Sequence, residues 1–180
     1  MNTIQTNSLS NKIILIGFMG TGKSAVADGL ASLLQLHKHD VDVAIVKHAG
    51  QEIPEIFAQA GEETFRNIET KVLNELLNSP EASIIATGGG AVLKDINRET
   101  MLKHGFVIHL KASAEVIISR VKHDTGRPLL QGDVEERVHQ LMSARAGVYD
   151  FAHFSIDTSD LTLPQVVSQI VEAWQQANLK

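Results

Sequence analysis

Short apolar runs alternate along the chain with longer stretches in which apolar residues recur every three or four positions. Residues 12–17 (KIILIG) predict a strand buried on both faces, because the run is apolar, rich in isoleucine and closed by glycine. Further strands are predicted at residues 83–86, 106–110 and, more weakly, 153–156. Helical spacing covers residues 24–35, 53–60, 62–77, 114–121, 134–146 and 164–177. Strands that alternate with helices predict an α/β fold whose parallel sheet is covered on both sides.

Length and composition narrow the class of protein. The chain of 180 residues fits a single domain (1–180), and its polar start, residues 1–10, is interpreted as a disordered leader. A net charge of -5 argues against a nucleic-acid partner, and the absence of cysteine excludes disulfides and thiolate metal sites. No apolar stretch approaches the roughly 20 residues that cross a bilayer. We therefore expect a cytoplasmic monomer with no membrane partner.

A glycine-rich loop joins the first predicted strand to the first predicted helix. Residues 17–24 (GFMGTGKS) match the phosphate-binding pattern G-x-x-x-x-G-K-[ST] at every position. Its glycines let backbone N–H groups turn around phosphate oxygens, and the helix directs its positive end at the same anion. In this motif Lys23 reaches the β- and γ-phosphates, and the Ser24 hydroxyl coordinates Mg²⁺. With a strand before it and a helix after it, the loop predicts ATP or GTP binding.

Two carboxylates could complement this loop. Asp40 and Asp42 stand at the end of a probable second strand, where a transition from strand to loop would let both face a cleft. One acid near Mg²⁺ and one near an acceptor hydroxyl would suit phosphoryl transfer, although such a pair taken alone is more often a surface feature. Residues 122–133 (KHDTGRPLLQGD) connect two predicted helices and are either a plain surface loop or a mobile lid.

Other polar residues fall at positions where they could contact a ligand. Arg66 and Glu69 lie about one helical turn apart and can interact. A glycine triplet at residues 88–90 directly follows a predicted strand. Because open α/β sheets bind ligands at the carboxyl ends of their strands, the triplet lets backbone approach a ligand there.

The joint order and spacing of these segments resemble the shikimate kinase family over residues 12–152. The resemblance rests on GFMGTGKS, DVD, IFAQAGEETFRNIE, ATGGGAV, GRPLL and an R-x-x-x-Y segment that ends at Tyr149. It implies a three-layer α/β/α fold of the P-loop NTPase type, with a five-stranded parallel sheet and a mobile lid over residues 122–133. It also implies that ATP donates its γ-phosphoryl group to the 3-hydroxyl of shikimate, giving shikimate 3-phosphate in aromatic amino-acid biosynthesis.

On the nucleotide side, the resemblance assigns roles around the P-loop. The residues it implies for ATP binding are Gly20, Thr21, Gly22, Lys23, Ser24, Ala25, Arg120 and Arg127. Ser24 would hold Mg²⁺, with Asp40 assisting through water. Arg127 would close with the lid and neutralise charge on the transferred group, and Arg120 would pack against adenine.

On the acceptor side, the implied shikimate-binding residues are Asp42, Phe57, Phe65, Arg66, Glu69, Gly88, Gly89, Gly90 and Arg145. Asp42 would bind the substrate hydroxyls and orient or deprotonate the attacking one, so that Asp42, Lys23 and Arg127 form the expected catalytic set. Arg66 and Arg145 would clamp the carboxylate, since a guanidinium can donate two parallel hydrogen bonds to it. Glu69 would hold Arg66, the glycines would approach the ring hydroxyls, and the two phenylalanines would line the apolar side of the ring.

Three positions depart from the family pattern. Ala25 stands where threonine is common, Val46 replaces a usual glutamate near the D-x-D segment, and Gly147 stands where proline usually separates Arg145 from Tyr149. The change at 46 weakens the expected hydrogen bonding beneath the two acids, and the glycine could loosen a turn. His37 and His39 lack an apparent third metal ligand, so an exposed or edge strand is the plainer interpretation.

Two other functions fit part of the pattern. One is a related P-loop kinase that acts on gluconate or a nucleotide, because arginines also suit other anionic acceptors. The other is a nucleotide-binding module without catalysis, against which Lys23, Ser24, Asp42 and Arg127 together argue. The combination of FRNIE, TGGG and RPLL favours shikimate as the acceptor.

Overall fold

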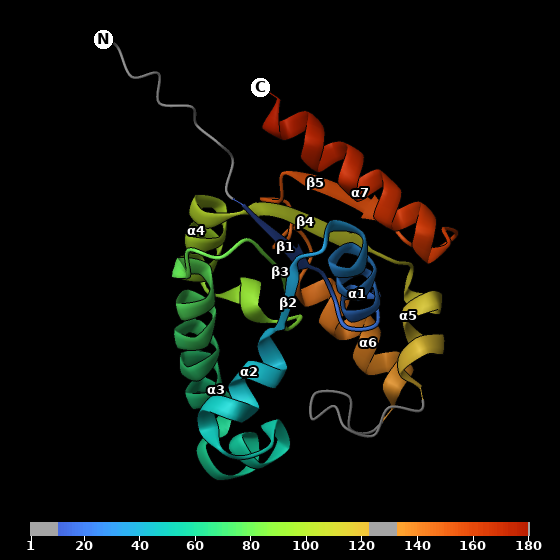
Figure 1. Ribbon diagram of the computed structural model, residues 1–180. Coiled ribbons are helices and arrows are strands. Elements are labelled where there is room, and N and C mark those ends of the chain that lie inside the picture. The colour runs from blue at the N-terminus through green and yellow to red at the C-terminus, as the bar shows by residue number, and fades with distance from the viewer. Residues whose placement is uncertain (1–10, 123–132, 180) are drawn as a thin grey trace.

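One parallel sheet organises the molecule (Figure 1). The computed structural model describes residues 11–122 and 133–179. Its five strands run in the order β2-β3-β1-β4-β5. They are β1 Lys12–Ile16, β2 His37–Asp40, β3 Ser83–Ala86, β4 Phe106–Lys111 and β5 Phe154–Asp157. All neighbours pair in parallel, which confirms the predicted five-stranded sheet.

The helices cover both faces of this sheet. They are α1 Lys23–Leu34, α2 Val41–Ala49, α3 Ile53–Asn78, α4 Asp95–His104, α5 Ala114–Val121, α6 Val134–Ala144 and α7 Leu163–Asn178, with a 3₁₀ turn at Ala91–Leu93. Two helices were predicted on either side of Gly61, and α3 is interrupted there, with φ 78° and ψ 171°. The sequence patterns did not indicate α2 or α4. Helix α4 buries only Asn97 and Met101 and therefore has no continuous apolar stripe.

Alternate residues of the central strand serve opposite layers of the core. Ile14 and Ile16 pack in one cluster with residues of α2, α3 and α4. Ile13 and Leu15 pack in another with α1 and α7, the helix that runs along one side of the sheet in Figure 1. Because each strand residue points opposite to its neighbour, one buried strand joins both layers. The three-layer α/β/α arrangement is as predicted.

A third cluster supports the loop that follows β1. Phe18 and Met19 on that loop pack against Ile117 and Val121 of α5 and Val138 of α6. The loop is thereby fixed at the carboxyl edge of the sheet, beside the ends of β2 and β3. Within residues 11–122 and 133–179, every helix is too short or too polar to cross a bilayer.

Candidate active site

The P-loop takes the conformation that its glycines allow. Gly20 and Gly22 have φ values of 78° and 95°, in the left-handed region that favours glycine. Helix α1 begins at Lys23, whose Nζ donates hydrogen bonds of 2.9 Å to the carbonyl oxygens of Gly17 and Phe18. Thr21 Oγ1 donates to the Phe18 oxygen over 2.8 Å. These contacts hold the loop in shape around the start of a helix, where an anion is favoured.

A cavity of about 290 Å³ lies over this loop. Its lining combines the loop and first helical turn with two carboxylates, the glycine segment and an arginine: Gly20, Gly22, Lys23, Ser24, Ala25, Asp40, Asp42, Thr87, Gly88, Gly89 and Arg120, besides Met19 and Ala86. Arg120 Nη1 donates to the Gly20 oxygen over 3.0 Å, which places this guanidinium against the P-loop. Thr21, also expected in ATP binding, is a buried residue of the loop and does not line this cavity.

The two aspartates lie where β2 passes directly into α2, and not at a transition into a loop as the sequence suggested. Asp40 is the N-cap of α2, and its Oδ1 accepts hydrogen bonds from the backbone N–H groups of Asp42 (3.0 Å) and Val43 (3.4 Å). Its other oxygen, Oδ2, lies 3.5 Å from Ser24 Oγ. A hydroxyl and a carboxylate so placed offer the oxygen ligands that Mg²⁺ prefers. The backbone cap also orders the D-x-D segment without a side-chain acceptor at Val46.

A second, smaller cavity of about 90 Å³ adjoins the first. Its lining contains every residue that the resemblance implied for the acceptor: Asp42, Phe57, Phe65, Arg66, Glu69, Gly88, Gly89, Gly90 and Arg145, together with Met19 and Ile53. The rings of Phe57 and Phe65 lie 4.7 Å apart and form an apolar wall. Because Asp42 and Gly89 line both cavities, the two form one continuous cleft.

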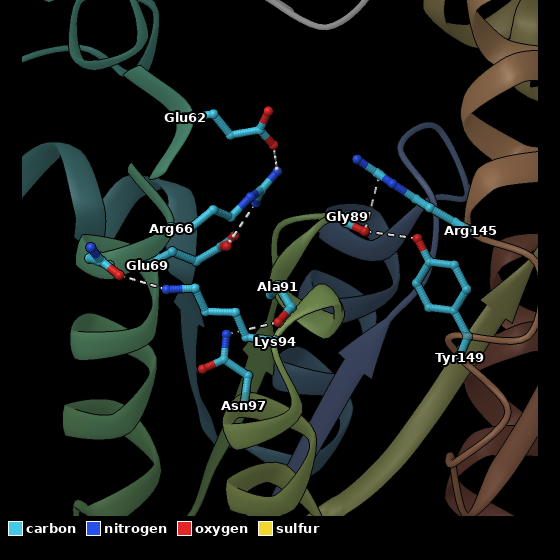
Figure 2. Close-up of polar contacts among 10 residues, drawn as sticks. Glu62, Arg66, Glu69, Gly89, Ala91, Lys94, Asn97, Arg145 and Tyr149 are labelled. Carbon is cyan, nitrogen blue, oxygen red and sulfur yellow. Dashed lines mark hydrogen bonds and ion pairs between the residues drawn. The ribbon is translucent and has the colours of Figure 1, made fainter. Parts of the chain in front are cut away.

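A buried ion pair forms one side of the second cavity. Arg66 Nη1 donates to Glu69 Oε2 over 2.7 Å, and Arg66 Nη2 donates to Glu62 Oε1 over 3.2 Å (Figure 2). Burial raises the pKa of Glu69, which is only 1% exposed, and Arg66 opposes this shift. Burial alone would lower the pKa of Arg66, but the two glutamates raise it above its usual value. Arg66 therefore keeps its charge, in an orientation set by two carboxylates.

The opposite side of the cavity is formed by the end of α6 and the turn after it. Arg145 Nη1 and Tyr149 Oη both donate to the carbonyl oxygen of Gly89, over 3.3 and 2.7 Å. Figure 2 shows them converging on this oxygen from the side opposite Arg66. Gly147 has φ 79°, a value closed to proline, so this turn takes a conformation that the usual family residue could not adopt.

Most of the expected site residues therefore meet in one cleft. Arg127 and most of the predicted lid lie outside the described residues, as does the predicted leader. Sequence reasoning gave no role to Glu62 or Tyr149. Glu62 could have been found from its position four residues before Arg66 on the same helix. His37 and His39 lie on β2, an edge strand as interpreted. Among the described residues, no three His, Cys, Asp or Glu side chains form a group that could hold a metal ion.

Comparison with known proteins identifies the family. A family model described as shikimate kinase matches residues 19–175. The shikimate kinase of Thermodesulfovibrio yellowstonii is 43% identical over 165 residues, which cover 91% of this chain and 95% of that protein. The shikimate kinase of Microcystis aeruginosa is 42% identical over 96% of this chain and 91% of its own length.

A solved structure agrees with these sequence matches. The shikimate kinase from Acinetobacter baumannii, solved in complex with shikimate, superposes with a TM-score of 0.90 and 36% identity, over 96% of this chain and 97% of the other. The P-loop, the D-x-D segment and the glycine triplet thus occur in a chain that resembles these kinases over nearly its whole length. This chain belongs to the shikimate kinase family.

Proposed function

We propose that this protein transfers the γ-phosphoryl group of ATP to the 3-hydroxyl of shikimate, giving shikimate 3-phosphate and ADP. The observation that carries the proposal is the continuous cleft. One half is lined by the P-loop and Lys23, and the other by two buried guanidinium groups, with Asp42 on the boundary. A triphosphate on one side and a carboxylate-bearing polyol on the other would bring donor and acceptor together at Asp42.

The residues of the nucleotide half would hold the donor. Lys23 and the backbone N–H groups of Gly20, Thr21 and Gly22 would bind phosphate oxygens, with the start of α1 contributing its positive end. In the present conformation Lys23 Nζ is hydrogen-bonded to loop carbonyls, so phosphate oxygens would take over donors that are already directed into the loop. Ala25 would contribute its backbone at the first turn, and Arg120 would lie against the base.

Mg²⁺ would be held by Ser24 Oγ, with Asp40 acting through water. The 3.5 Å between the two side-chain oxygens and their place in the nucleotide cavity support this assignment. When bound, the metal would offset negative charge on the β- and γ-phosphates. Asp40 is already fixed by its helix-capping contacts, so its second oxygen, Oδ2, has a defined direction toward Ser24.

The acceptor half would position the attacking hydroxyl. Arg66 and Arg145 would bind the carboxylate of shikimate from opposite sides, while Glu69 holds Arg66 in place. Asp42 would accept a hydrogen bond from the 3-hydroxyl and receive its proton as the O–P bond forms. Because phosphoryl transfer passes through a loose transition state, we infer that alignment is the larger part of this contribution. Arg127 would add positive charge near the transferred group.

A substrate panel tests this function. Purified protein is assayed for ADP release with ATP and Mg²⁺ against shikimate, gluconate and nucleoside monophosphates, with product confirmed by mass spectrometry. Turnover with shikimate alone is expected. Turnover confined to gluconate or a nucleotide would identify that compound, and not shikimate, as the acceptor. ATP binding without any turnover would favour a non-catalytic module.

We also propose that the enzyme acts as a monomer in the cytoplasm. The residues that line both cavities come from one chain, so the described cleft needs no second copy to complete it. Light scattering during size-exclusion chromatography would test the state of association, and fractionation of the source cells would test the compartment.

A further inference from the structure

The carbonyl oxygen of Gly89 is held by two side chains from a distant part of the sequence. Tyr149, 60 residues further along, donates the shorter hydrogen bond, 2.7 Å from Oη to the oxygen. Arg145 donates the longer one, at 3.3 Å. Arg145 is expected to contact the acceptor, whereas Tyr149 does not line the acceptor cavity. Tyr149 therefore contacts the glycine segment from the side that faces away from the acceptor cavity.

Because the peptide bond is planar, the contact on the Gly89 oxygen also sets the direction of the Gly90 N–H at the cavity. In a trans peptide the C=O of one residue and the N–H of the next point in opposite directions. A Gly89 carbonyl that points toward Tyr149 consequently directs the Gly90 N–H away from it, toward the side on which Arg66 lies. Three consecutive glycines have wide backbone freedom. Their orientation is set jointly by the turn hydrogen bond from the Ala91 N–H to the Gly88 oxygen, over 3.2 Å, and by the two side-chain contacts on the Gly89 oxygen.

Tyr149 is itself firmly placed. Its side chain is 6% exposed and belongs to the core cluster that also contains Ile14 and Ile16. The ring of His109 stacks on it, with centroids 4.7 Å apart and planes inclined by 20°. Burial raises the pKa of Tyr149 above its usual value, so the phenol keeps the proton that it donates. The hydroxyl is thus a rigid donor anchored in the core.

We propose that Tyr149 is a positioning residue for the acceptor substrate: its hydroxyl fixes the Gly89–Gly90 peptide so that this segment presents its backbone correctly to shikimate. The inference rests on the proposed function, in which the glycine segment contacts the acceptor. It adds a residue that touches neither substrate and acts through one backbone carbonyl. Because Gly90 lines the acceptor cavity and not the nucleotide cavity, loss of the hydroxyl should weaken acceptor binding much more than ATP binding.

The decisive variant is Tyr149→Phe, which keeps the ring and its stacking on His109 and removes only the donor. We expect the KM for shikimate to rise about 5- to 20-fold, the effect of losing one buried hydrogen bond, while the KM for ATP stays within about twofold. A merely structural role would not divide the two constants in this way. Equal rises in both KM values, or no rise in either, would overturn the proposal.

The matched control is His153→Phe. His153 Nδ1 accepts a 3.0 Å hydrogen bond from the Val107 N–H, and its ring stacks on Phe106, so this variant also removes one partner of a backbone group and retains an aromatic ring. It lies in neither cavity. We expect lower thermal stability with an unchanged KM for shikimate. A KM rise equal to that of Tyr149→Phe would assign the effect to general loosening of the fold.

A second measurement needs no destabilising change. Tyr149 is the single tyrosine of the chain, so growth on 3-fluorotyrosine labels this position alone. We expect its one ¹⁹F resonance to shift when shikimate saturates the labelled protein. If the ¹⁹F resonance does not shift with shikimate in protein that phosphorylates shikimate, the positioning role is refuted and the proposed function stands. An absence of shikimate turnover in the wild type would instead refute the proposed function.

Discussion

A methyl group at Gly90 should selectively damage the acceptor cavity. Gly90 has φ -103° and ψ -2°, a conformation open to alanine, so Gly90→Ala introduces no left-handed strain. Its new Cβ would instead lie 2.6 Å from both Cζ and Nη1 of Arg66. Ordinary carbon contacts begin at about 3.5 Å, so the guanidinium must move by about 1 Å. The perturbation is therefore purely steric and directed at one side chain.

The magnitude follows from what holds Arg66. Its hydrogen bonds of 2.7 Å to Glu69 and 3.2 Å to Glu62 fix the guanidinium plane, and a 1 Å shift cannot preserve both these bonds and the grip on a carboxylate. One charge-assisted hydrogen bond contributes about 1.5–3 kcal/mol. We therefore expect the Kd for shikimate to rise about 10- to 150-fold, at about 1.4 kcal/mol for each factor of ten.

Isothermal titration calorimetry with shikimate, and separately with an unreactive ATP analogue, measures this effect. Gly50→Ala is the control: Gly50 ends α2 with φ 69°, and no atom lies within 4 Å of its would-be Cβ. That variant should lose about 1–2 kcal/mol of stability through backbone strain and keep its shikimate affinity. Shikimate binding by folded Gly90→Ala within twofold of the wild type, or equal weakening in both variants, would refute the proposed steric effect on Arg66.

Three further substitutions test separate parts of the site. Asp42→Asn should bind the ATP analogue normally in calorimetry, yet turn over about 10²- to 10⁴-fold more slowly, and normal turnover would remove Asp42 from the mechanism. Glu69→Ala leaves Arg66 buried with only its half-exposed partner Glu62, so urea denaturation should show a loss of about 3 kcal/mol, whereas a loss below 1 kcal/mol would contradict a buried pair. Burial lowers the pKa of His109 from 6.5 to about 4, so the unfolded chain binds the proton first as the pH falls. The contribution of neutral His109 to the free energy of unfolding should therefore be complete above pH 6.5 and fall by about 2 kcal/mol by pH 5. His109→Phe should flatten this part of the curve of urea-derived stability against pH, and an unchanged slope would exclude His109 as its cause.

The fold was predictable where burial acts on both faces of an element. β1 is apolar along almost its whole length because α3 covers one side and α7 the other, so its sequence signal is strong. Helix α4 has no such apolar pattern, because Met101 makes most of its contact with the core. Helix α2 is short and follows its strand without a loop. The side chain of Asp40 caps its start, whereas the sequence pattern had suggested only a role in phosphoryl transfer for this residue.

The residues of the site also differ in whether the sequence could predict them. Lys23 and the D-x-D pair are local motifs placed by the carboxyl ends of adjacent strands, and parallel topology brings such ends to one edge. The hydrogen bond from Tyr149 to Gly89 joins residues 60 positions apart and depends on how the turn after α6 lies beside the segment that follows β3. Local patterns contain no information about such a distance, so only the three-dimensional structure could give Tyr149 a role.

The charges of the acceptor cavity show why its substrate should carry a carboxylate. Arg66 already has two carboxylate partners, Glu69 and Glu62. Arg145, only 5% exposed, forms no ion pair within the part of the chain that the structure describes; its contacts there include the Gly89 oxygen and the face of Phe18, 5.6 Å away. Glu69 acts on Arg145 electrostatically from beyond ion-pair distance. A carboxylate bound directly to this guanidinium would therefore add a charge-assisted hydrogen bond that no carboxylate of the described residues provides. Selectivity for an acidic acceptor would then arise from a guanidinium that has no directly paired carboxylate in this half of the cleft.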